Sequence, residues 1–156
     1  MAHLLADAGA VGVMVVDLPD HEAERWHSAA QGANLRTPRL VPRDTIDSDL
    51  TTLAADASGW LYAPASAAPT GYRGPLDLPS LAAFTSRLRS VSTLPVVSGV
   101  GVSTPALAAH VAPLADAVVI GTPIVQALDT GPAQAPLLTA TFAQALRPSH
   151  PTENRA

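Results

Sequence analysis

Apolar residues along this chain form short continuous runs that alternate with longer segments of helical spacing. Runs rich in β-branched residues are typical of parallel strands buried on both faces. Between them, apolar side chains recur every three or four residues, as at Leu81, Phe84 and Leu88, which indicates one buried helical face. The pattern predicts strands at 11–16, 37–42, 59–63, 94–98 and 117–120, a helical stub within 1–10, and helices at 20–31, 47–56, 80–92, from 105, at 123–128 and at 137–146.

This regular alternation of strand and helix predicts an α/β fold with a parallel sheet. The 156 residues suit one domain but fall short of a complete β/α barrel, which typically needs about 250. Five strands do not close an eight-stranded barrel, so a partial barrel and an open doubly wound sheet both agree with the pattern. We expect one domain over 1–147 and a polar, flexible C-terminal tail over 148–156.

The stretch from 94 to 125 contains two predicted strands that each lead into a glycine and then a helix. Glycine at such a turn, as at Gly101 and Gly121, lets the backbone approach a ligand closely. The N–H groups at the following helix start attract anions, phosphate above all. Since the loops after strands seven and eight of a β/α barrel form its usual phosphate site, the stretch predicts such a site. The alternative, that these glycines only serve tight turns, stays open.

Composition excludes several kinds of chemistry. The net charge of −4 offers no electrostatic reason to expect nucleic acid. The chain has no cysteine, and all nine basic residues are arginine, so disulfides, thiol nucleophiles and a lysine Schiff base are excluded. The five histidines show no spacing with carboxylates that suggests a metal site.

Nothing in the sequence predicts a membrane or export segment. No apolar run approaches the roughly 20 residues that a membrane helix needs. The first residues lack the cationic start and long apolar run of a signal peptide. We therefore expect a cytoplasmic protein.

Four blocks in order, at 8–19, 59–71, 94–105 and 115–125, carry a family resemblance. They include an Asp-x-Pro loop at 17–19, a Pro-Thr-Gly loop at 69–71 and the two strand-to-glycine turns. The chain resembles the C-terminal part of the tryptophan synthase alpha chain, the indole-3-glycerol-phosphate lyase, over about residues 4–128. The resemblance implies a partial (β/α)8 TIM barrel made of strands four to eight with their helices. Another phosphate-binding barrel of similar build remains an alternative.

The resemblance implies an activity in tryptophan biosynthesis. The family is a lyase that cleaves indole-3-glycerol phosphate to indole and glyceraldehyde 3-phosphate in a retro-aldol reaction. Its catalytic carboxylates lie on strand two and the following loop, and no residue of this chain maps to them, so we predict no catalytic residue here. We expect a chain that is truncated and inactive alone; a non-catalytic half-barrel that binds phosphate or a partner is the alternative.

The resemblance also implies a set of binding residues. Gly71, Gly101, Gly121 and Thr122 match positions that hold the substrate phosphate, and Tyr62 matches a tyrosine that lines the substrate pocket. For Tyr62 a core position with a solvated hydroxyl is equally compatible, and Thr122 also suits a helix cap. The sequence departs from the family pattern in two loops, 42–45 and 65–68, and the second departure loses an arginine and a glycine.

Partners follow from the same resemblance. Asp17 and Pro19 match a loop that contacts the tryptophan synthase beta chain, which carries the pyridoxal phosphate; this chain is expected to bind no cofactor. A solvated loop aspartate is the simpler alternative for Asp17. Five strands leave two sheet edges, at 11–16 and 117–120, so we also expect self-association through exposed side chains, which we predict to be Val13, Val15 and Val118.

Overall fold

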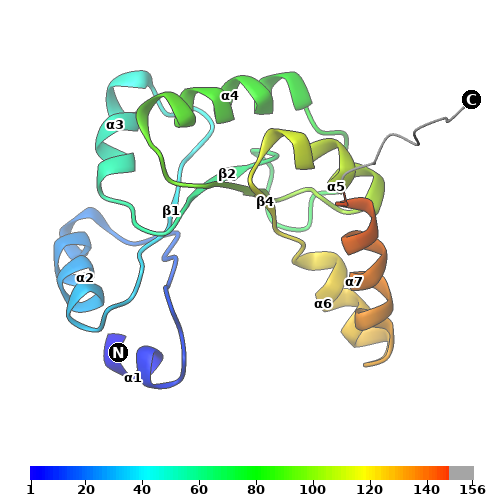
Figure 1. Ribbon diagram of the computed structural model, residues 1–156, viewed down its shortest axis with the longest axis horizontal. Coiled ribbons are helices and arrows are strands. Elements are labelled where there is room, and N and C mark those ends of the chain that lie inside the picture. Colours follow the sequence, from blue (N-terminus) through cyan, green and yellow to red (C-terminus); the bar gives the residue numbers. More distant parts are fainter. Residues whose placement is uncertain (148–156) are drawn as a thin grey trace, which may run out of the picture.

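A computed structural model describes residues 1–147 as an arch of helices around one parallel sheet (Figure 1). The sheet has the order β1-β2-β3-β4, and every neighbouring pair is parallel. In chain order the elements are α1 (Ala2–Asp7), α2 (Asp20–Gly32), β1 (Arg39–Leu40), α3 (Asp47–Ala55), β2 (Leu61–Pro64), α4 (Leu78–Val91), β3 (Val96–Gly99), α5 (Pro105–Val111), a 3-10 turn (Ala112–Leu114), β4 (Ala117–Val118), α6 (Thr122–Thr130) and α7 (Gln134–Ala145).

Two helices begin at side-chain caps that the sequence supplies. Asp77 accepts a hydrogen bond from the Ser80 N–H at 3.0 Å and starts α4, and Pro79 follows in its first turn. Thr104 accepts from the Leu107 N–H at 3.2 Å and starts α5, with Pro105 at its first position, as the sequence predicts. These caps fix the points at which the loops after β2 and β3 end.

The two faces of the sheet differ in what covers them. Alternate strand residues, such as Leu61, Ala63 and Val96, pack with Phe84 and Leu88 under α3 and α4, which lie over one side of the sheet (Figure 1). The residues between them belong to the opposite face; among these, Leu40 and Val97 are only half-buried and Val119 is 44% exposed. Within residues 1–147, this opposite face of the sheet is therefore only partly covered.

Residues 11–16 do not form the predicted strand. They make a single parallel bridge, Gly12 with Arg36, and Val11 and Val16 are 78% and 60% exposed. An apolar run becomes a buried strand only when neighbours pair with it, and in the described part of the chain this run has a neighbour on one side alone. Val13, Val15 and Val118, predicted to be exposed, are instead half-buried, because Val13 packs against α1 and α2 and Val118 packs beside α5.

The remaining elements differ from the predictions mainly at their ends. β1 is confined to Arg39–Leu40 between Pro38 and Pro42, since proline lacks the N–H that a ladder needs. Helix α7 begins at Gln134, three residues earlier than predicted. Strand β4 ends at Val118, two residues sooner than predicted. No helix within 1–147 is long and apolar enough to cross a membrane. The predicted tail at 148–156 lies outside the described residues, so the domain boundary stays a prediction.

Candidate functional site

A cleft of about 210 Å³ lies at the C-terminal edge of the sheet, where β2, β3 and β4 end. In parallel β/α folds this edge carries the binding and catalytic groups. We call it the C-terminal cleft; its lining comprises Tyr62, Thr70, Gly71, Tyr72, Arg73, Val100, Val102, Ser103, Val119, Gly121, Thr122 and Pro123. Four of the five predicted substrate residues therefore come together, and Gly101 is the one that does not line the cleft.

The Tyr62 side chain passes close to Gly99 and lines the cleft. Its side chain is 6% exposed, and a Cβ placed on Gly99 would overlap the Tyr62 hydroxyl. Burial raises the pKa of the Tyr62 phenol, so the hydroxyl stays protonated and can donate a hydrogen bond at neutral pH. The ring is buried and the residue lines the cleft, an arrangement that agrees with either alternative for Tyr62.

Gly101 stands behind the cleft and holds the loop at 65–77 close. Its φ of +88° is a conformation that favours glycine, and a Cβ there would lie 3.0 Å from Leu76 Cδ2 and 3.2 Å from Tyr72 Cδ1. Its neighbour Val100, which does line the cleft, has a φ of +57°. The turn requirement alone therefore explains Gly101.

Gly121 and Thr122 bring a helix N-terminus to the cleft. Gly121 is the N-cap of α6, its φ is −99°, and apart from Gly121 and its two chain neighbours no residue has an atom within 4 Å of the place where its Cβ would stand. Thr122 is the first residue of the helix but makes no side-chain cap hydrogen bond, since the capping position is Gly121. The turn therefore does not explain Gly121, whereas an anion placed against the first turn of α6 would use the open space beside it.

The opposite wall of the cleft comes from the loop between β2 and α4. Gly71, with a φ of +93°, lies here with Thr70 and Arg73, and the Arg73 guanidinium donates a hydrogen bond to the Gln126 side chain on α6. Sequence reasoning missed Thr70 and Arg73 as lining residues, although their place beside Gly71 was a usable signal. Within the described residues, no carboxylate lines the cleft and no group of three or more potential metal ligands comes together.

The other predicted or unusual residues lie elsewhere. Asp17 and Pro19 are exposed in the turn after 11–16. This exposure suits a protein interface, and their contact with a partner stays a prediction. Arg43 reaches from one loop that departs from the family pattern to the other, and donates to the carbonyl oxygens of Pro64 and Ala65.

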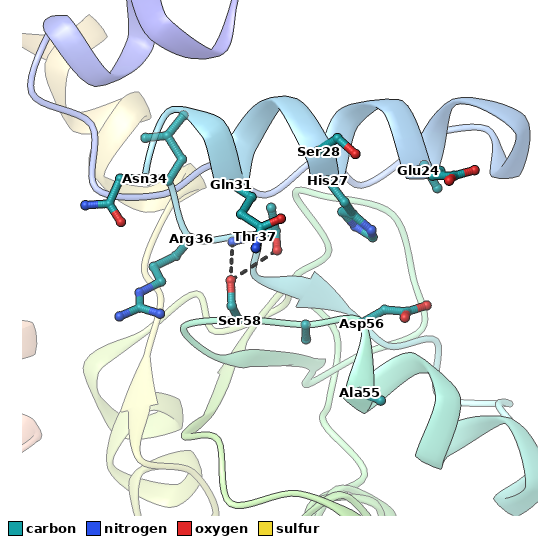
Figure 2. A pocket seen from close by; sticks show the side chains of 13 residues that line it. Glu24, His27, Ser28, Gln31, Asn34, Arg36, Thr37, Ala55, Asp56 and Ser58 are labelled. Carbon is teal, nitrogen blue, oxygen red and sulfur yellow. Dashed lines mark hydrogen bonds between the residues drawn. The ribbon is translucent and has the colours of Figure 1, made fainter.

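A larger hollow, of about 770 Å³, lies at the opposite edge of the sheet. Figure 2 shows His27 and Gln31 projecting into it from α2, while Thr37 and Ser58 close its floor with hydrogen bonds of 2.8 and 3.1 Å. Thr37 and Ser58 precede β1 and β2, so the hollow is at the N-terminal edge of the strands. In β/α barrels this edge serves stability rather than chemistry. Two further hollows, of about 640 and 500 Å³, lie beside Pro42 and Asp44, which follow β1. The C-terminal cleft is the candidate site because it gathers the residues that the family resemblance assigns to the substrate.

Comparison with known proteins decides the family. The model of the family described as tryptophan synthase alpha chain matches residues 1–148. This chain belongs to the tryptophan synthase alpha chain family. The tryptophan synthase alpha chain of Caulobacter vibrioides is 36% identical over 129 residues, which are 83% of this chain and 46% of that protein. That of Desulfosudis oleivorans is 40% identical over 114 residues, 73% of this chain and 43% of that protein.

Solved structures place the fold within the same family. A structure of Mycobacterium tuberculosis tryptophan synthase matches with a TM-score of 0.84 and 32% identity, over 94% of this chain and 55% of that chain. The prediction of a partial β/α barrel with a parallel sheet is thereby confirmed. This tryptophan synthase alpha chain homologue spans about half the length of the curated relatives it matches.

Alanine substitution is expected to separate the two glycines by stability. At Gly101, positive φ and the contacts with Leu76 and Tyr72 predict that Gly101→Ala lowers the free energy of unfolding by about 1–3 kcal/mol. At Gly121, where the added methyl meets open space, Gly121→Ala is expected to change it by less than about 0.5 kcal/mol. Urea denaturation followed by circular dichroism measures both, and equal losses would contradict the distinction.

Proposed function

We propose that the C-terminal cleft binds the phosphate group of indole-3-glycerol phosphate, as the phosphate-side half of a tryptophan synthase alpha-type active site. One observation carries the proposal: Tyr62, Gly71, Gly121 and Thr122, which the family resemblance assigns to the substrate, line a single cleft. They come from three different parts of the chain, so their meeting is a property of the fold and not of a local motif.

The chemistry of the cleft suits a small anion. The N-terminus of α6 supplies a positive dipole end beside the open space at Gly121. Arg73 adds a guanidinium, which pairs with phosphate oxygens through its planar fork. At about 210 Å³ the cleft is smaller than the roughly 300–1,000 Å³ of drug-sized sites, which favours a phosphate group over a whole large ligand.

The lyase step itself needs more than this cleft holds. Retro-aldol cleavage requires groups that move protons, usually carboxylates, and none lines the cleft within residues 1–147. We propose that the chain contributes binding to the reaction and does not cleave the substrate alone. The same observation favours the second candidate function, a non-catalytic half-barrel that binds phosphate or a protein partner.

The proposed protein partner is a beta chain of tryptophan synthase. Asp17 and Pro19, exposed in the turn that follows 11–16, are the residues we propose for this contact. A pull-down of the beta chain with wild-type chain and with Asp17→Lys is expected to show weaker capture by the variant, because a charge reversal opposes complementary contacts. Equal capture would remove Asp17 from the proposed interface.

Titration with inorganic phosphate, followed by backbone amide chemical shifts, tests the cleft. We expect a dissociation constant on the order of 1 mM, as for one anion held by a few hydrogen bonds. The shifts are expected to concentrate at residues 71–73, 102–103 and 121–124. Shifts scattered evenly over the chain, or absent at those residues, would remove the site.

Gly121→Ala provides the matched variant for this titration. Because its fold is expected to be intact, weaker phosphate binding in this variant would report on the cleft and not on stability. Sodium chloride at equal ionic strength is the control for non-specific screening.

A further inference from the structure

The loop at 65–77 forms one wall of the C-terminal cleft but has few ties of its own. Within it, the Ala68 N–H donates to Ser66 Oγ at 3.0 Å and the Tyr72 N–H donates to the Pro69 carbonyl at 3.1 Å. The segment is rich in alanine, proline and glycine, and Ala65 and Leu76, near its two ends, join a core cluster. The Ala65 N–H donates to the Gly99 carbonyl of β3 at 2.6 Å, and Asp77 caps α4, but neither contact joins one end of the loop to the other.

Arg43 contacts both ends from the neighbouring loop after β1. Its Nη1 donates to the carbonyl oxygens of Pro64 at 3.1 Å and Ala65 at 3.2 Å, where the loop begins. Its Nη2 donates to Ser80 Oγ at 2.6 Å, in the first turn of α4, where the loop ends. Since the Ser80 N–H also donates to the capping Asp77, one guanidinium joins the start of the loop to the cap at its finish.

The Arg43 guanidinium also packs on an aromatic ring. Its central carbon lies 5.6 Å from the centre of the Phe84 ring, a side chain 3% exposed on α4. Burial lowers the pKa of the Arg43 guanidinium and the Asp77 carboxylate raises it, but arginine keeps its charge throughout the range in which proteins are folded. The contact is therefore a permanent hold and not a pH switch.

We propose that Arg43 is a positioning residue for the C-terminal cleft: by holding both ends of the loop at 65–77 it sets Thr70, Gly71 and Arg73 against the N-terminus of α6. The inference rests on the proposed phosphate site. It explains how a loop of small residues keeps Arg73 within hydrogen-bonding reach of Gln126. It also requires arginine, since two separate nitrogens of the planar fork reach the two ends of the loop and lysine has a single nitrogen.

Arg87 is the matched control. Its guanidinium carbon lies 5.9 Å from the centre of the same Phe84 ring, but its hydrogen bonds go to Asp47 and to the Thr45 carbonyl, both outside the loop at 65–77. Arg87→Met therefore removes a comparable arginine from the same ring while leaving the loop ends tied.

The test compares wild type, Arg43→Met, Arg43→Lys and Arg87→Met by amide hydrogen exchange without ligand and by phosphate titration. In Arg43→Met the amides at 66–73 are expected to exchange about ten-fold faster, and phosphate affinity to fall about ten-fold, as for loss of a charge-assisted hydrogen bond. Arg43→Lys is expected to show the same effects in weaker form, and Arg87→Met to stay within about two-fold of wild type.

The two readouts keep the proposals separable. Unchanged exchange at 66–73 in a folded Arg43 variant overturns the positioning role, whether or not phosphate binds. Absence of phosphate binding by wild type overturns the proposed function, while the exchange rates still decide the role of Arg43. If Arg43→Met fails to fold, Arg43→Lys decides, and an effect of equal size in Arg87→Met would also overturn the inference.

Discussion

The purified 156-residue chain is expected to release no indole from indole-3-glycerol phosphate above the uncatalysed rate. General acid and base groups each contribute about 10²–10⁴-fold to such reactions. The family resemblance assigns no catalytic carboxylate to this sequence, and within the described residues no carboxylate lines the C-terminal cleft. Chromatographic detection of indole after long incubation at micromolar chain concentration is the measurement.

Release of indole in proportion to chain concentration would contradict this expectation. Asp17, at the C-terminal end of the 11–16 segment, would then be the first acid to test, through Asp17→Asn. A release that Asp17→Asn abolishes would make Asp17 catalytic, whereas a release that persists would point to a contaminating lyase or to another acid.

The second large effect concerns assembly: the chain alone is expected to self-associate at about 10 µM. On its outer side, the segment 11–16 is paired with no other part of residues 1–147, and the apolar residues Val11 and Val16 of this segment are exposed. Unpaired edges with apolar side chains are templates for pairing with another copy. Light scattering is expected to give a mass at least about twice the 16.0 kDa of one chain.

Charges on this edge are expected to reverse the effect. Val11→Lys together with Val16→Lys should shift the chain to monomer, since lysine on an edge strand opposes pairing. Leu137→Lys is the matched control, because Leu137 is 63% exposed on α7, away from the edge. A wild-type chain that scatters as a monomer and unfolds cooperatively would refute the prediction.

The sequence predicts the helices better than the strands, and the reason is physical. A helix carries its own start signals, so Thr104 and Pro105 mark α5 without knowledge of the rest of the fold. A strand is defined by its neighbours: the valine-rich run at 11–16 has the composition of a buried strand, but one bridge to Arg36 does not make it one. Asp77 was missed as the cap of α4 because a proline-rich loop conceals where the helix begins.

In the candidate site, too, local features could be predicted from the sequence and contacts between distant residues could not. Gly121 follows a strand and Gly71 lies in the Pro-Thr-Gly loop, and both are local features, so their place in the cleft lining could be predicted from the sequence together with the family resemblance. Contacts between distant positions could not: nothing local shows that Gly99 makes room for the Tyr62 hydroxyl, or that Arg43 reaches Ser80. The sequence shows that 42–45 departs from the family pattern, but it does not show that Arg43 in this segment bonds to the loop at 65–77.

Val100, directly after β3, places backbone strain in the wall of the C-terminal cleft. A β-branched residue with a φ of +57° is in a conformation that costs about 1–3 kcal/mol, and it persists only where the surroundings enforce it. That cost is a sizeable part of the roughly 5–15 kcal/mol by which native domains are stable. The tip of β3 is thus held under backbone strain between two glycines, and substitution of Val100 by glycine would relax the fold at the expense of the side chain that lines the cleft. Stability and the shape of the cleft wall are in direct opposition at this one residue.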